Sequence, residues 1–192
     1  MTPQNDSTRR KGDRASVSSF DESTVSPQPR GQTATALEAV LARLGDGTVA
    51  SLYVREVRNL RTRSYQFRAP RTPVRVEVLH TLLGIELKIG RSRLLCPDRA
   101  TARFLAVFAA LGVEEVAVPY DITQVARLAD LFESAIEQMM TTLEAETEAM
   151  SIRMKGRVRN LLIGLQRDEI GRAGAGPAIP EFDQNTRQRR RR

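Results

Sequence analysis

The sequence predicts an α+β domain: a mixed, mainly antiparallel sheet of about five or six strands with a βαβ unit, a short N-terminal helix and a long C-terminal helix. Three observations lead to this prediction. Short apolar runs that alternate with polar residues, and that end at Gly or Pro, recur between residues 49 and 96. A helical pattern joins two apolar runs, 94–96 and 116–118, and a connection of that length is typical of parallel strands. From Ile122 onward, apolar residues continue at helical spacing past residue 150.

The 192-residue chain has room for one domain flanked by two polar tails. Residues 1–33 and 171–192 contain too few apolar side chains to offset the entropy of ordering, so both are predicted to be disordered. The α+β domain is placed at residues 34–140 and a helical extension at residues 141–170. The net charge of +7 is typical of a nucleic-acid-binding protein, but most of the excess lies in the C-terminal tail.

The first predicted elements are a helix and a strand. Thr35 and Glu38 have the spacing of a capping box, and Gly45 stands where a helix C-cap is expected. The apolar stripe between them consists of Leu37, Val40, Leu41 and Leu44. After a Gly-Asp-Gly turn, residues 49–57 alternate between apolar and other side chains, which predicts a strand.

A meander of strands is predicted next. Residues 64–69 and 74–78 alternate in the manner of half-buried strands. Residues 79–83 fit either a continuation of the second strand or one helical turn, with a bend at Gly84. Residues 85–89 and 93–96 form a hairpin around Gly90 and Arg91, and this hairpin is expected to lead into the βαβ unit.

The long helix predicts association. A helix from residue 122 to 155 would be about 50 Å long, which exceeds the width of a small domain. Its far half would then project or pair, so a homo-oligomer or a helical protein partner is expected, in the manner of a coiled coil. The candidate contacts are Phe132, Met139, Leu143, Met150 and Met154. The alternative is that the helix bends near Glu146 and folds back, with residues 157–170 as a further amphipathic piece.

Arginines cluster between residues 55 and 75. The members are Arg55, Arg58, Arg61, Arg63, Arg68, Arg71 and Arg75, and aromatic Tyr53, Tyr65 and Phe67 lie among them. On a regular strand, residues 61, 63, 65 and 67 share one face. Guanidinium groups neutralise phosphates and aromatic rings stack on bases, so the pattern indicates single-strand nucleic-acid binding. The alternative is that the rings are core and the arginines are a solvated rim. The tail ends in a second basic element, Arg189, Arg190, Arg191 and Arg192.

A weaker candidate lies at the predicted βαβ unit. The carboxyl ends of two parallel strands open on one edge, which would bring together Cys96, Asp98, Tyr120 and Asp121 as a small-ligand crevice. His80, the one histidine, would be the base for a cysteine nucleophile. The competing interpretation makes Cys96 a small core residue, and Asp98 and Asp121 helix N-caps.

Several classes of protein are disfavoured. A single cysteine excludes an intrachain disulfide framework, and no catalytic, phosphate-loop or metal-binding motif is found, so no enzyme activity, cofactor or metal is predicted. The chain has no segment apolar enough for membrane insertion or for a signal peptide, which favours the cytoplasm. The preferred hypothesis is a bacterial-type, non-enzymatic regulatory or accessory protein that binds nucleic acid. A protein–protein adaptor or scaffold is the alternative, and a small-ligand-binding domain is the third.

Overall fold

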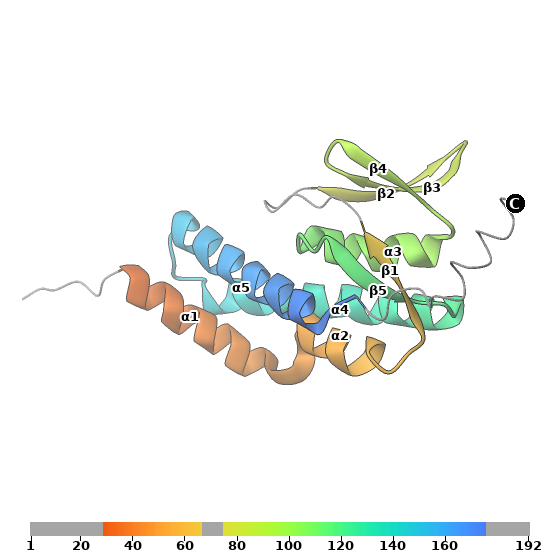
Figure 1. Ribbon diagram of the computed structural model, residues 1–192. Coiled ribbons are helices and arrows are strands. Elements are labelled where there is room, and N and C mark those ends of the chain that lie inside the picture. Colours follow the sequence, from red (N-terminus) through yellow and green to blue (C-terminus); the bar gives the residue numbers. More distant parts are fainter. Residues whose placement is uncertain (1–28, 67–74, 176–192) are drawn as a thin grey trace, which may run out of the picture.

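Helices form the body of the protein, and two small sheets pack against them (Figure 1). The computed structural model describes residues 29–66 and 75–175. The helices are α1 (Pro29–Leu44), α2 (Val49–Val57), α3 (Arg99–Ala110), α4 (Ile122–Glu146) and α5 (Ile152–Ala173), with a 3₁₀ turn at Gly45–Gly47. The strands are β1 (Thr62–Gln66), β2 (Val76–Thr81), β3 (Gly84–Ile89), β4 (Ser92–Cys96) and β5 (Glu115–Pro119). The predicted α+β class is confirmed.

The first two helices differ from the prediction. Helix α1 begins at Pro29 rather than near Thr35, whose hydroxyl donates to the Gly31 carbonyl oxygen inside the helix, so the predicted capping box is wrong. Its end beside Gly45 is as predicted, and Gly45 takes a φ of 50°. Residues 49–57 are helix α2 rather than a strand. The Thr48 side chain caps this helix by accepting a hydrogen bond from the Ser51 amide.

The strands form two separate antiparallel sheets, and the predicted βαβ unit is wrong. Strands β2, β3 and β4 form a three-stranded meander, whereas β5 pairs with β1. Strands β4 and β5, which flank α3, therefore belong to different sheets, and the described residues contain no parallel pair. The predicted hairpin at Gly90 is confirmed, with Ile89 opposite Ser92. Residues 79–81 continue β2, which settles the ambiguity at this point in favour of a strand.

The long helix does not extend to residue 155. Helix α4 ends at Glu146, the chain turns through residues 147–151, and α5 runs back along α1 and α2 (Figure 1). The Thr147 hydroxyl donates to the Leu143 carbonyl oxygen at 2.7 Å, and the Ser151 side chain caps α5 by accepting from the Met154 amide. The interpretation in which the chain bends near Glu146 and folds back is the one that the structure shows.

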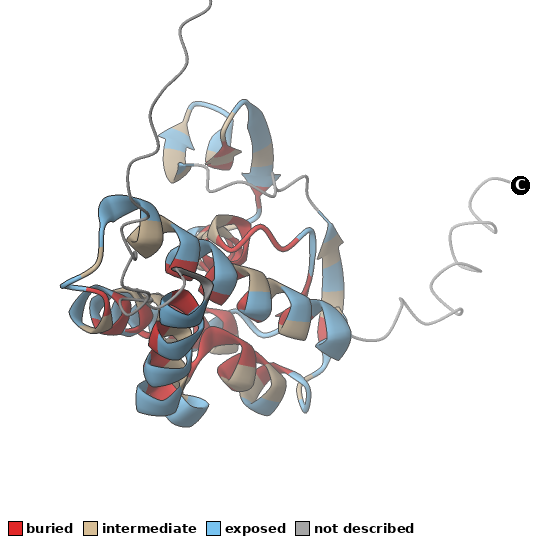
Figure 2. Ribbon diagram, turned by 90° about the vertical axis from the view of Figure 1, so that its left-hand side faces the viewer, coloured by how far each residue is buried: buried red, intermediate tan, exposed pale blue. Residues whose placement is uncertain are grey.

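The core lies where α3 meets α4, and its centre is aromatic. Phe104, Phe108 and Phe132 contact one another with ring centroids 5.0 to 5.6 Å apart, and Tyr53 of α2 packs edge-on against Phe108 at 5.4 Å. All four side chains are buried. Figure 2 shows buried residues on the inward sides of the helices and exposed residues on their outward sides. The core thus fixes α2, α3 and α4 relative to one another, and β5 runs beside them.

Candidate nucleic-acid interface

Strand β1 is an edge strand whose one face carries arginine and tyrosine. It pairs with β5, so that Arg63 lies opposite Val118 and Tyr65 opposite Val116. One step beyond the strand, the Tyr120 amide donates to the Arg61 carbonyl oxygen at 3.2 Å. Because side chains two residues apart share a face, Arg61, Arg63 and Tyr65 are aligned along β1, with Tyr120 beside them.

The four side chains form an alternating stack. The Arg61 guanidinium carbon lies 5.2 Å from the centre of the Tyr120 ring. The Arg63 guanidinium carbon lies 5.0 Å from the Tyr65 ring centre and 5.8 Å from the Tyr120 ring centre. These distances are within the range of cation–π attraction. We call this set, Arg61, Arg63, Tyr65 and Tyr120, the β1 surface. The prediction that residues 61, 63 and 65 share a face is confirmed.

The arginines of the β1 surface have no acidic partner among the described residues. Arg61 and the neighbouring Arg58 are exposed, Arg63 is half-buried, and none of the three forms an ion pair within the described part of the chain. The Nε atom of Arg63 is shielded from solvent and has no hydrogen-bond acceptor there. Two exposed guanidinium groups, those of Arg58 and Arg61, and one half-buried group, that of Arg63, therefore have no ion pair within the described residues.

The other predicted nucleic-acid contacts lie elsewhere or outside the described residues. Arg55 is ion-paired with Glu56 at 3.1 Å, and Arg75 with Glu77 at 2.6 Å, so each is partly neutralised. Hydrogen bonds from Arg55 and Arg127 hold the pKa of Glu56 below its ordinary value. The remaining members, Phe67, Arg68, Arg71, Arg189, Arg190, Arg191 and Arg192, lie outside the described residues.

The structure does not form the predicted small-ligand crevice. Cys96 ends β4 opposite Ile85 of the meander, whereas Tyr120 and Asp121 follow β5 of the other sheet. Asp98 caps α3 by accepting from the Thr101 amide at 2.7 Å, and Asp121 caps α4 by accepting from the Thr123 amide at 2.9 Å. Cys96 is buried, and burial raises the pKa of its thiol, which disfavours the nucleophilic thiolate. The core and cap interpretation therefore holds for these three residues.

The predicted association seam faces the interior of the chain. Phe132, Met139 and Leu143 are buried in the core, and two half-buried methionines lie nearby, Met150 in the turn between α4 and α5 and Met154 in the first turn of α5. The packing of α1, α3 and α5 against α4 accounts for this burial. The first three side chains are thus unavailable to a partner unless the helices separate.

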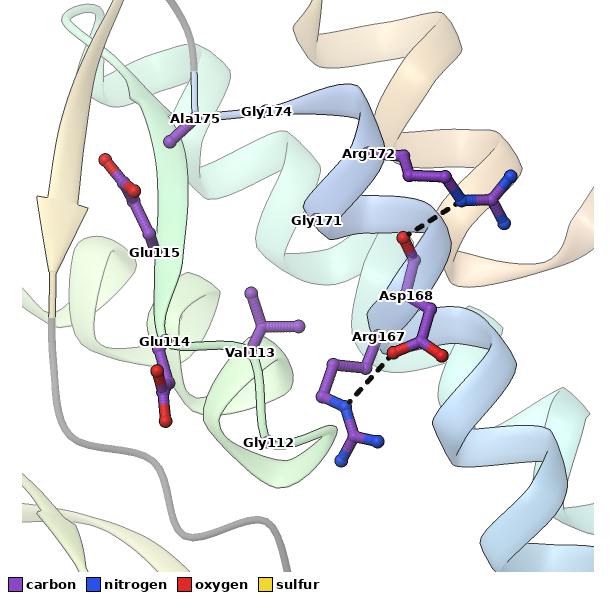
Figure 3. Close-up of a pocket in the computed structure, with 10 residues that line it drawn as sticks. All are labelled: Gly112, Val113, Glu114, Glu115, Arg167, Asp168, Gly171, Arg172, Gly174 and Ala175. Carbon is purple, nitrogen blue, oxygen red and sulfur yellow. Dashed lines mark hydrogen bonds and ion pairs between the residues drawn. The ribbon is translucent and has the colours of Figure 1, made fainter.

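A groove that no sequence motif marks lies between α5 and the turn before β5. Its volume is about 620 Å³, and it is lined by Gly112, Val113, Glu114, Glu115, Arg167, Asp168, Gly171, Arg172, Gly174 and Ala175. Val113 extends toward α5, where Arg167 pairs with Asp168 at 3.5 Å (Figure 3). Glu115 accepts hydrogen bonds from Ser64 and Gln66, which lower the pKa of its carboxyl group. The groove is thus of ligand size, but the charges around it are mixed in sign.

Tyr53 connects this groove to the sheet. Its hydroxyl accepts from the Ala117 amide at 2.9 Å and donates to the Gly174 carbonyl oxygen at 2.8 Å. The phenol therefore satisfies the amide on the side of β5 away from β1, and it fastens the end of α5 beside β5. Although Tyr53 lies among the arginines in sequence, it belongs to the core.

The described residues contain no group of His, Cys, Asp and Glu side chains that would hold a metal ion. Among the helices of this part of the chain, none has the length and hydrophobicity required to cross a membrane. Comparison of the chain with known protein families, with curated proteins and with solved structures finds no match.

Proposed function

We propose that the protein binds single-stranded nucleic acid through the β1 surface, in a regulatory or accessory role. The observation that carries the proposal is the alternating stack of Arg61, Arg63, Tyr65 and Tyr120 on an edge strand, without acidic partners in the described residues. Arg58, which is exposed at the end of α2, adds a third guanidinium group nearby in sequence that has no ion pair among the described residues.

The chemistry of the stack suits an unpaired strand. Aromatic rings and guanidinium planes both accept a stacked base, and stacking on an aromatic ring contributes roughly 1–3 kcal/mol per base with little sequence preference. Guanidinium groups that are not already paired bind phosphates by releasing counterions from the nucleic acid. Tyr120 is 47% exposed, so one ring of the stack is accessible to a base. The recessed Arg63 would orient that ring.

The proposal is tested by fluorescence anisotropy of a labelled single-stranded oligonucleotide with the full chain at several salt concentrations. The double variant Arg61→Gln/Arg63→Gln should bind about 30-fold more weakly if each arginine contributes about 1 kcal/mol. If both arginines contact phosphates, the slope of log affinity against log salt should also fall by about 1.4. Tyr120→Leu should weaken binding without changing that slope, because it removes a stacking ring and no charge.

The matched control is Arg91→Gln/Arg99→Gln, which removes two exposed arginines that have no ion pair within the described residues. Arg91 lies in the β3–β4 turn and Arg99 begins α3, so both are outside the β1 surface. If the two double variants lose the same oligonucleotide affinity, binding depends only on the total charge of the chain, which would contradict the proposal. Absence of any salt-dependent binding by the intact chain would also contradict it.

A further inference from the structure

The first two turns of α5 carry a second concentration of positive charge. Arg153, Lys155, Arg157 and Arg159 fall within seven consecutive residues, and no acidic residue interrupts them. None of the four forms an ion pair within the described residues. Figure 1 shows these turns at the end of the molecule where α1 also begins. We call this segment, residues 152–159, the α5 tip.

The α5 tip also exposes an aliphatic side chain. Ile152 is the first residue of α5 and is 90% exposed. Met150 and Met154, on either side of it in sequence, are half-buried. An exposed isoleucine alone is ordinary, but this one directly precedes four cations that form no ion pair within the described residues. At helical spacing, Lys155 and Arg159 lie on the same side of α5 as Ile152, whereas Arg153 and Arg157 lie on the adjoining side.

The position of these charges costs folding stability. Cations in the first turns of a helix oppose its dipole, and acidic residues are preferred there. The first turn of α5 contains no acidic residue. Departures from a local rule of this kind concentrate at functional sites. A negatively charged partner would offset the unfavourable interaction between these cations and the dipole of α5.

We propose that the α5 tip binds the surface of an anionic phospholipid membrane, with Ile152 entering the interface and the four cations meeting the headgroups. Interfacial binding of proteins combines burial of apolar side chains with attraction to anionic lipids, and does not require a spanning segment. Nucleic acid satisfies the cations equally well, but it offers no apolar medium to an isoleucine. Glu144 and Glu148 are the exposed acids closest in sequence, and they leave the tip with a surplus of two positive charges.

The test is co-sedimentation of the full chain with vesicles of phosphatidylcholine alone and with vesicles that also contain phosphatidylglycerol. The intact chain should bind the anionic vesicles only. Ile152→Ser, which changes no charge, should weaken binding about tenfold, and Ile152→Phe should retain it. Arg153→Gln/Arg157→Gln should weaken binding about 25-fold, at about fivefold for each cation near the surface.

One control variant separates this surface from nonspecific adsorption to vesicles. Leu82→Ser alters a leucine that is 107% exposed on the turn between β2 and β3, and it should leave vesicle binding unchanged. Because the polybasic tail responds to charge alone, the uncharged exchange at Ile152 is the decisive variant. Absence of anionic-vesicle binding, or equal effects of Ile152→Ser and Leu82→Ser, would overturn the proposal. Loss of oligonucleotide binding in Arg153→Gln/Arg157→Gln, with no effect of Ile152→Ser on vesicles, would assign the tip to nucleic acid instead.

Discussion

The hydroxyl group of Tyr53 is expected to contribute strongly to stability, and Tyr53→Phe removes it while the ring stays in place. The ring packs against Phe108 in the core, and phenylalanine preserves that contact. The hydroxyl accepts from the Ala117 amide and donates to the Gly174 carbonyl oxygen. The variant therefore isolates two hydrogen bonds at the junction of α2, β5 and α5.

The two hydrogen bonds should contribute unequally. Ala117 is 3% exposed, so its amide would be left without a partner in a dry environment, at a cost of about 1–3 kcal/mol. Gly174 is exposed, so water replaces the phenol at its carbonyl oxygen and the loss there is small. Loss of both hydrogen bonds in Tyr53→Phe should lower the free energy of unfolding by about 2 kcal/mol. For a chain of this size, that corresponds to a decrease in Tm of about 4–8 °C.

Urea and thermal unfolding followed by circular dichroism measure this loss. The matched control is Tyr65→Phe, because the hydroxyl of half-buried Tyr65 makes no hydrogen bond within the described residues. The control should change the free energy of unfolding by less than about 0.5 kcal/mol. If Tyr53→Phe is no more destabilising than Tyr65→Phe, the two hydrogen bonds of the Tyr53 hydroxyl do not stabilise the junction of α2, β5 and α5.

The same phenol predicts a dependence on alkaline pH. Burial raises the pKa of Tyr53 above its ordinary value of 10.0. Above that pH the unfolded chain loses a proton that the folded chain retains, so the free energy of unfolding falls as pH rises. The contribution is fully present below pH 10.0 and is lost through the folded-state pKa. The alkaline loss of stability should therefore be smaller in Tyr53→Phe than in the unaltered chain.

Three further substitutions test the contacts that join the elements. Gln166→Leu removes the oxygen that accepts from the buried Ala50 amide at 3.0 Å, and should lower the free energy of unfolding by about 2 kcal/mol in urea titrations. Asp98→Ala removes the N-cap of α3 and should lower the free energy of unfolding by about 1 kcal/mol. Asp98→Asn keeps a capping oxygen and should lower it much less. Arg103→Met removes the ion pairs that join α3 to Asp130 and Glu133 of α4. Because these groups are partly exposed, the loss should not exceed about 1 kcal/mol and should shrink in about 1 M salt.

The class of fold follows from the sequence, but residues 49–57 are predicted as a strand and form helix α2. Over nine residues, Ala50, Leu52 and Val54 alternate as in a strand, yet the apolar residues of the segment also fit one side of a helix. The decision comes partly from Thr48, whose capping position is readable in sequence. It comes also from Gln166, which supplies an acceptor to the Ala50 amide from 116 residues away. That second contribution is tertiary and leaves no local signal.

Strand pairing limited the prediction of the candidate site in the same way. The alternation of residues 61, 63 and 65 gave the shared face of β1 correctly, because the period of a strand is a local property. The addition of Tyr120 to that face depends on the pairing of β1 with β5, more than fifty residues later. The hydrophobic period of a strand does not show which distant strand it pairs with. The sequence therefore predicts a crevice position for Tyr120, whereas the structure places it beside β1.

The apolar pattern of α4 correctly predicts a buried stripe, but it does not predict which helices bury it. The apolar seam is real, but periodicity reports only that a stripe is buried, and here the chain's own helices bury it. Self-packing of this kind buries Phe132, Met139 and Leu143 of the predicted seam, and among the described residues it leaves cations without ion pairs at the β1 surface and at the α5 tip. Any partner of the folded chain at these two surfaces would therefore meet positive charge first. Its affinity should fall with salt, whereas association through the buried seam would require α1 and α3 to separate from α4 and would respond to denaturant instead.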